Sequence, residues 1–402
     1  MTTFARGVAK TVTINPETSF GIVGAGTGQL LRRTSSDLNL SVAQVQSQEI
    51  LQSQQVRDQR NGPRQVQGTL AGQLSPSTYS MLFEGLLRST FAVVLPLVNF
   101  TDTAATLDGN QNVVVTTSGG NFAQRFRNGD MLRVSGLIGA SAVNNFDDAR
   151  VIAVSAGSMT LSVPKGSAAW TTGQTNTFTL PGKKLFIPAT GQLNKSFSLE
   201  HWYSDIGESE LFLGCKVTQI SLNIPASGFV TVQASVSGQD MAKTTVQAFP
   251  APAPLSGTTG LTATTGKVSY NGAAIAYISA MSIQIVSSVG NDPVVGSNIV
   301  PEIFLGTLTV RGSISAMTTS DSLTADFLNE NEVSLSVLMT TGPADSAEFM
   351  SIHMPRVKLI SSTKNDSDKA IMRSFNFVAL ENTGSASGHD LTSIVVQDSQ
   401  TP

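Results

Sequence analysis

Two stretches of the chain share one pattern, in which alternating apolar positions give way to helical spacing. In residues 306–331, three apolar residues alternate with polar ones and predict a strand with one buried face: Leu308, Val310 and Ile314. A short helix is expected next, over Asp321–Asn329, with Ser320 or Asp321 as its cap. Its apolar side is predicted to consist of Leu323, Phe327 and Leu328.

Residues 68–90 repeat this pattern, beginning with the same Gly-Thr-Leu triplet that opens at Gly306. A helix is expected over Ser77–Arg88, with Ser75 as its cap and Pro76 at the first helical position. Four apolar residues fall at helical spacing: Tyr79, Leu82, Phe83 and Leu86. Two such matching stretches point to an internal duplication.

The segments around both stretches support the duplication. Each copy is predicted to contain a strand, a long polar connector, a second strand, a helix and three further strands. The connectors are 44–64 and 290–302. The three later strands are expected from Phe197, within 215–224 and within 229–238 in copy one, and from Val333, within 355–360 and within 374–380 in copy two.

The two copies are interrupted and joined by other segments. Residues 101–182 contain their own alternating runs and Gly-containing turns, which predict a small β module inserted into the first copy. The Gly- and Thr-rich stretch around 254–266 is expected to be a linker. The predicted organisation is an N-terminal arm 1–34, a first domain 35–100 plus 183–250, the insert 101–182, a linker 251–277 and a second domain 278–402.

The composition excludes several classes of protein but does not identify one. Only 13% of the 402 residues are charged and the formal net charge is −3, so the chain lacks the basic excess of a nucleic-acid binder. Its single cysteine, Cys215, excludes an intramolecular disulfide and a cysteine-based metal cluster. We expect no signal peptide in residues 1–10 and no membrane span, since no apolar run is long enough.

Candidate catalytic and binding residues are scattered. Gly24 and Gly26 begin a dinucleotide-like motif, but Gln29 takes the place of its third glycine and no βαβ unit follows, which favours a flexible arm. The histidines (His201, His353, His389) and four carboxylates (Asp205, Glu208, Glu210, Asp240) form no recognisable motif. Cys215 begins a strand and is expected to be buried. We therefore expect no catalytic, cofactor-binding or metal-binding residue, and no enzyme.

The order of these motifs resembles a known family. Residues 41–87 and 196–240 look like successive parts of a tail tube protein of long-tailed bacteriophages. Residues 281–286, 306–315, 353–360 and 374–380 resemble the tube domain a second time. The insert, with RNGDMLRVSG and ARVIAVSAGSMTLSV, is similar to small β modules of phage tails.

This resemblance implies an all-β fold with minor helix, built from two tandem antiparallel β-sandwich or barrel domains, each with one flanking helix. It implies a structural virion protein, assembled in the host cytoplasm, whose stacked rings conduct DNA without sequence-specific binding. Three double-domain chains would replace six single ones in each ring. Segments 44–64 and 290–302 would contact the next ring, and tape measure, tail terminator and tail tip proteins would be further partners.

An alternative from another class is a β-rich surface or adhesion protein that binds glycans or cells. Such a protein would be expected to carry a secretion signal or an anchor. A tube protein would instead form rings or tubes visible by negative-stain microscopy.

Overall fold

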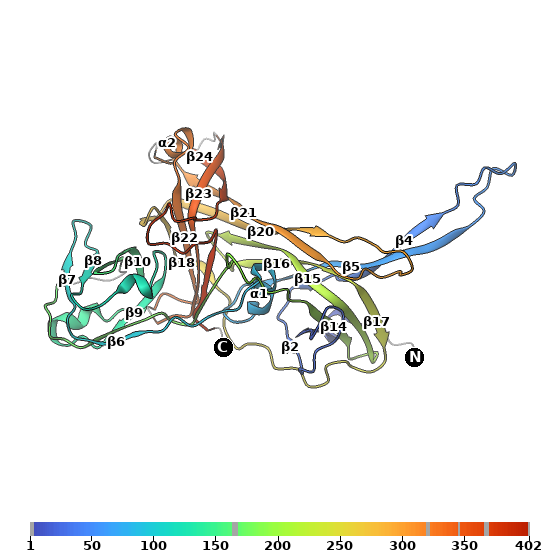
Figure 1. Cartoon of the computed structure of the whole chain (residues 1–402), viewed down its shortest axis with the longest axis horizontal. Coiled ribbons are helices and arrows are strands. Elements are labelled where there is room, and N and C mark those ends of the chain that lie inside the picture. Colours follow the sequence, from blue (N-terminus) through green and yellow to red (C-terminus); the bar gives the residue numbers. More distant parts are fainter. Residues whose placement is uncertain (1–3, 163–167, 319–321, 345, 366–369, 401–402) are drawn as a thin grey trace.

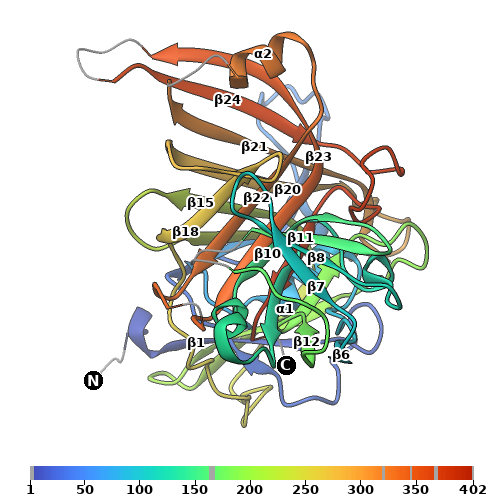
Figure 2. The same cartoon turned by 90° about the vertical axis from the view of Figure 1, so that its left-hand side faces the viewer.

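The structure is a computed structural model that describes residues 4–162, 168–318, 322–344, 346–365 and 370–400. Antiparallel strands dominate it, with two short α-helices in the described chain, so the prediction of an all-β fold with minor helix is confirmed. An elongated body carries a long hairpin at one end and a separate β module at the other (Figure 1). Figure 2 shows the same body with the module facing the viewer.

The first repeat begins with the 3-10 turn η1 (Gly7–Ala9) and strand β1. Its elements, in chain order, are β1 (Lys10–Pro16), β2 (Gln29–Leu30), β3 (Ser35–Ser36), β4 (Asn39–Gln46), β5 (Gln59–Gln73), α1 (Ser80–Leu87), β14 (Phe197–Tyr203), β15 (Glu208–Pro225), β16 (Thr231–Gly238) and β17 (Asp240–Thr244). Helix α1 packs against β15.

The second repeat has the same order. Its elements are β18 (Thr262–Tyr270), β19 (Ala273–Ile275), β20 (Ile278–Gly290), β21 (Phe304–Met317), α2 (Ser322–Leu328), β22 (Val333–Thr340), β23 (Phe349–Asn365), β24 (Met372–Ala379) and β25 (Val395–Asp398). Helix α2 packs against β23, as α1 packs against β15.

The segment between α1 and β14 forms a separate seven-stranded sheet. Its elements are β6 (Leu97–Phe100), β7 (Ala104–Leu107), β8 (Val113–Thr116), η2 (Phe122–Gln124), β9 (Met131–Ser135), η3 (Gly139–Asn144), β10 (Ala149–Val154), β11 (Ser158–Ser162) and β12 (Asn176–Thr179), followed by β13 (Lys183–Phe186). A distinct apolar cluster fills this module, with Phe122, Phe126 and Phe178 fully buried. The alternating apolar residues of its strands account for that core.

The two repeats agree pair by pair in their strand registers. Phe197 of β14 faces Cys215 of β15, and the register then shifts so that Leu199 faces Phe212. In the second repeat Val333 of β22 faces Val357 of β23, and after the same shift Leu335 faces Met354. The pairings β4–β5 and β20–β21 also share one shift, after Val42 and after Ser287. Because bulges are kept at fixed places in a fold, these matches agree with the predicted duplication.

The registers correct the sequence alignment of the two copies. Gly68 faces Val236, and the residue that takes this place in the second repeat is Gly312, which faces Phe377. The triplet that begins at Gly306 therefore does not match the triplet at Gly68, because Gly306 lies six residues before the matching residue, Gly312. A Cβ on Gly312 would lie 2.1 Å from the Ser282 carbonyl oxygen, so close strand approach explains this glycine.

Two segments that the sequence analysis assigned to an arm and a linker contain strands. In the N-terminal segment, β1 pairs along its whole length with β14, and Val12 and Ile14 are buried. In the segment 251–277, β18 pairs with β22 in the corresponding place. β1 has only two apolar residues, Val12 and Ile14, and in β18 the Thr and Gly residues obscure the alternation. Each repeat thus begins earlier than its sequence pattern indicated.

The expected helix caps also need correction. Helix α1 begins at Ser80, because residues 76–79 form a turn, and Tyr79 rather than Ser75 is its N-cap residue. Ser75 Oγ instead lies 2.6 Å from Thr78 Oγ1. Ser320 and Asp321, the caps expected for α2, lie outside the described residues.

A single sheet runs through both repeats. Residues Gln219–Pro225 of β15 pair with Ala280–Val286 of β20, so the last strands of the first repeat continue into the first hairpin of the second. Apolar residues of both repeats join in one core beneath this sheet, among them Ile220, Ile283 and Phe375. The helices α1 and α2 contribute Phe83 and Leu323 to the same core.

Candidate assembly interface

The sheet that joins the repeats has a strand edge at each end. Along the described chain the order is β4–β5–β16–β15–β20–β21–β24–β23. Residues 358–365 of β23 pair with β24 on one side, and no described strand pairs with their other side. At the far end β4 pairs with β5 alone among the described strands. Unpaired edges present rows of backbone N–H and C=O groups to other chains.

The two edge strands of the sheet, β23 and β4, correspond to the two strands that pair where the repeats meet, β15 and β20. β15 and β23 occupy the same place in their repeats, and so do β4 and β20. Within the chain, β15 pairs with β20. The edge of β23 is therefore built like the edge of β15 that receives β20, and β4 is built like β20.

One face of this sheet is polar across both repeats. Cross-strand partners place the following residues on it: Gln67, Thr69, Gln219, Ser221, Asn223, Gln233, Ser235, Ser237, Ser282, Gln284, Arg311, Ser313, Ser315, Ser374 and Asn376. Hydroxyl groups bond across the strands, as between Ser282 and Ser313 at 2.8 Å and between Ser315 and Ser374 at 2.9 Å. Arg311 is charged, and a second cation, Lys358, lies at the β23 edge of the same face, since both face Val378. The opposite face forms the core.

The long connectors leave the sheet at the same relative position in each repeat. In the first, β4 and β5 pair out to Gln46 and Gln59, so most of the expected connector 44–64 is a hairpin arm. This arm projects away from the body at the upper right of Figure 1. Its faces carry few apolar residues, and backbone pairing rather than burial forms its strands. Ile50 near its tip is fully exposed.

In the second repeat the corresponding loop, 291–303, folds against the first repeat. Arg64 N–H donates to the Asn298 carbonyl at 2.7 Å, and Gln239 Nε2 donates to the Val300 carbonyl at 2.7 Å. Lys216, which is 1% exposed, forms an ion pair with Glu302. The apex of the loop stays exposed at Val295.

A buried polar network attaches the inserted module to the second repeat. Arg150 of the module donates to Ser269 Oγ at 2.6 Å, and the Gln397 side chain bonds both the N–H and the carbonyl of Met131, at 2.9 and 3.0 Å. Met131 also packs against two apolar residues of the second repeat, Leu338 and Phe349. Although the module interrupts the first repeat in sequence, it rests on the second.

A comparison with family models bears on these observations. A model described as phage tail tube protein matches residues 7–379. The chain belongs to the phage tail tube protein family. A comparison with curated proteins returns no match.

Membership of the tail tube family gives the protein a structural role in a phage tail and places it in the virion. The first repeat, the module and the second repeat as far as β24 lie within the family match, and β25 lies beyond its end. Among the described residues, no helix is long and apolar enough to span a membrane. The all-β architecture expected from the resemblance is the architecture found.

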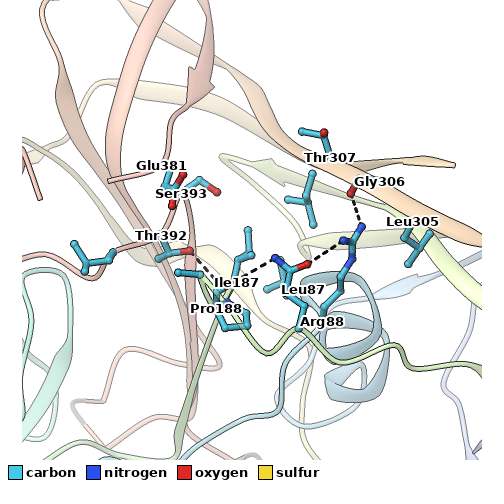
Figure 3. Close-up of a pocket in the computed structure, with 14 residues that line it drawn as sticks. Leu87, Arg88, Ile187, Pro188, Leu305, Gly306, Thr307, Glu381, Thr392 and Ser393 are labelled. Carbon is cyan, nitrogen blue, oxygen red and sulfur yellow. Dashed lines mark hydrogen bonds between the residues drawn. The ribbon is translucent and has the colours of Figure 1, made fainter. Parts of the chain in front are cut away.

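The tail tube protein has a cavity of about 560 Å³ between α1, the second repeat and the chain near its C-terminus (Figure 3). Arg88, the αL residue that ends α1, donates from Nη2 to the Gly306 carbonyl at 2.5 Å and to Ser287 Oγ at 3.0 Å. Its Nη1 donates to Gln192 Oε1 at 3.2 Å. The cavity brings Arg88 and Glu381 together with hydroxyl and apolar side chains, a set that contains no paired nucleophile and base.

The candidate residues from the sequence are dispersed over the fold. Glu208 pairs with Lys243 and Asp240 with Arg64, Glu210 accepts from the Tyr203 hydroxyl, and Asp205 accepts from the Arg6 N–H. Cys215 is buried as expected, and burial raises the pKa of its thiol. Across the described ranges, no group of three or more His, Cys, Asp or Glu residues could hold a metal ion. Gly24 and Gly26 pack beside Asn15.

The histidines lie in two separate buried settings. His201 Nε2 lies 2.7 Å from Ser36 Oγ, and burial, aided by Lys10 and Arg33, lowers its pKa to about 3. His353 Nε2 lies 2.8 Å from His389 Nδ1 and the two rings are stacked. Burial lowers the pKa of both, and each ring lies too close to the other for double protonation. This contact leaves no local pattern in the sequence, because the chain near His389 must fold back onto β23 to make it.

Proposed function

We propose that three copies of this protein close into a ring with six repeat positions, and that stacked rings form the tube through which the phage genome passes. The observation that carries this proposal is the match between the intrachain junction and the two strand edges. A head-to-tail interface that repeats and closes produces a ring. Because one chain supplies two adjacent positions, three chains complete six.

The intrachain junction predicts the register of the contact between chains. Ser221 faces Gln284 where β15 meets β20. In β23 the residue that corresponds to Ser221 is Thr363, because each lies two residues after the register shift of its strand. In β4 the residue that corresponds to Gln284 is Asn39, because each lies three residues before the last residue ahead of the shift. Thr363 of one chain is therefore proposed to face Asn39 of the next.

The polar face of the sheet is proposed to line the channel. Its hydroxyl and amide side chains bond to one another, and its cations are few, with Arg311 inside the face and Lys358 at its β23 edge. Each Lys or Arg that neutralises a phosphate adds salt-dependent affinity for DNA, so a nearly uncharged wall lets DNA slide. The exposed apices at Ile50 and Val295 are available for contacts between stacked rings.

Paired cysteines test the ring. The double variant Asn39→Cys with Thr363→Cys should form disulfide-linked oligomers that stop at three chains once assembled and oxidised. The matched control, Ser221→Cys with Gln284→Cys, should form its disulfide within one chain. Symmetry of the tube by cryo-microscopy gives an independent count. Six chains in each ring, or no cross-linking of assembled tubes, would contradict the three-chain ring.

The remaining partners follow from the proposed role. A tube of fixed length requires proteins that set and cap that length, so tape measure, terminator and tip proteins are proposed partners, with assembly in the host cytoplasm. No observation on this chain favours the alternative of a glycan- or cell-binding surface protein.

A further inference from the structure

The two repeats place a lysine at the same position, next to the residue where β15 or β23 changes register. Lys216 follows Cys215 of β15, and Lys358 follows Val357 of β23. Each lysine also lies near a residue three positions before the paired strand, β14 in the first repeat and β22 in the second. Lys216 Nζ donates to Asn194 Oδ1 at 2.7 Å, and Lys358 Nζ lies 4.0 Å from Glu330 Oε2.

The two lysines differ in what covers them. Lys216 also bonds Glu302 and the Ile303 carbonyl, both from the loop 291–303, and is 1% exposed. Within the described ranges no such loop covers Lys358, and its side chain is 34% exposed, with Glu332 Oε1 at 3.8 Å. Lys216 of the first repeat is covered by a loop of the repeat that pairs with it, so Lys358 would be covered by the arm of a first repeat that pairs with β23. The first repeat of the same chain already pairs with β20, so this arm would come from another chain.

The arm of the first repeat carries an acid at the place of Glu302. Asn61 and Leu305 are matching residues beyond the bulges of the two hairpins. Glu302 is the third residue before Leu305, and Asp58 is the third residue before Asn61. Asp58 is 57% exposed in its side chain and pairs with the still more exposed Arg60. Both repeats therefore carry an acid at this position, but among the described residues Asp58 pairs with Arg60 on its own arm rather than with a lysine of a repeat.

We propose that the base of the arm lies over the second repeat of the neighbouring chain in the ring, and that Asp58 of one chain pairs with Lys358 of the next. This inference rests on the proposed ring. It assigns the arm a function inside the ring, where it fastens each chain to its neighbour as the loop 291–303 fastens the two repeats. Its tip beyond Ile50 remains free to contact the next ring.

Charge reversal tests the pair. Asp58→Lys should raise the protein concentration needed for tube assembly about tenfold or more, because it places two cations together at each contact between chains. Lys358→Glu should do the same. The combination of both should restore assembly to within about threefold of the parent chain. Glu49→Lys is the matched control on the same arm and should have a smaller effect that Lys358→Glu does not reverse.

Cross-linking separates contacts within a ring from contacts between rings. Asp58→Cys with Lys358→Cys, treated with a short bis-maleimide after assembly, should give products that stop at three chains. A ladder that runs beyond three chains would place the arm between rings and overturn the inference. Single variants that assemble as well as the parent would also overturn it, whereas failure of the parent chain itself to form tubes would count against the proposed function.

Discussion

Lys184 and Asp130 form a buried ion pair, with 2.6 Å between Lys184 Nζ and Asp130 Oδ1. Lys184 follows the inserted module in sequence and Asp130 lies within it, while a third partner, Asp390, comes from the chain after the second repeat, 2.7 Å from Nζ. Burial lowers the pKa of Lys184, but the two carboxylates more than offset this and hold it above its ordinary value. These three residues therefore join the module, the strand β13 that follows it and the segment before β25.

Removal of this lysine should destabilise the fold strongly. Lys184→Met leaves Asp130, 3% exposed, without its cation, and loss of one partner of a buried pair costs about 3–5 kcal/mol. Urea denaturation followed by tryptophan fluorescence measures the change in unfolding free energy. Lys243→Met, which removes a more exposed lysine paired with Glu208, is the control and should leave the midpoint nearly unchanged. Equal effects of both variants would refute a structural role for the buried pair.

Stability should fall as the pH drops below the ordinary histidine pKa of 6.5. His201, His353 and His389 all have lowered pKa values in the fold, so the unfolded chain binds protons in this range and the folded chain does not. Each histidine then removes up to about 1.4 kcal/mol per pH unit below 6.5, until its folded pKa is reached. Denaturation between pH 7.5 and about 5 measures the slope.

A variant identifies the contribution of the stacked pair. His389→Gln keeps a hydrogen-bonding group near His353 and removes one titrating ring, so its slope between pH 7.5 and about 5 should be shallower than that of the parent chain. An unchanged slope would show that His389 is protonated equally in both states.

Close strand approach makes Gly312 intolerant of a side chain. Its Cβ would meet the Ser282 carbonyl oxygen at 2.1 Å and the Phe377 ring at 2.5 Å, so Gly312→Ala should cost about 1–3 kcal/mol of unfolding free energy. Gly109→Ala is the matched control, because nothing lies within 4 Å of its added Cβ. A Gly312→Ala chain as stable as the control would show that the two strands separate easily.

Lysines on the polar face should make the tube retain DNA. In the parent chain this face is mostly hydroxyl and amide groups with few cations, so tubes should bind DNA weakly and with little dependence on salt. Tubes of the triple variant Gln67→Lys, Gln233→Lys and Gln284→Lys should bind DNA with an affinity that falls steeply as salt rises, by about 0.9 in log–log slope for each phosphate contacted. Filter binding across a salt series measures this slope. Identical slopes for variant and parent would indicate that the face lies away from DNA.

The sequence by itself determined the fold class, both helices and most of the strands, and its repeated pattern predicted a duplication. Alternation at positions such as Val310 and Ile314 is a local signal, and it survives because one face of each strand is buried in the shared core. The family resemblance rested on the same local order. The strands β1 and β18 escaped notice, because β1 has only two apolar positions and Thr and Gly positions weaken the alternation in β18.

Only the tertiary structure decided which residues of the two copies correspond. The Gly-Thr-Leu triplets suggested one alignment, while the strand registers matched Gly68 with Gly312. Pairing register depends on bulges and on contacts between distant strands, which leave no local trace in sequence. The same holds for Lys216 and Lys358: each looks like any strand lysine, and only the packing of the loop 291–303 over Lys216 shows what Lys358 lacks.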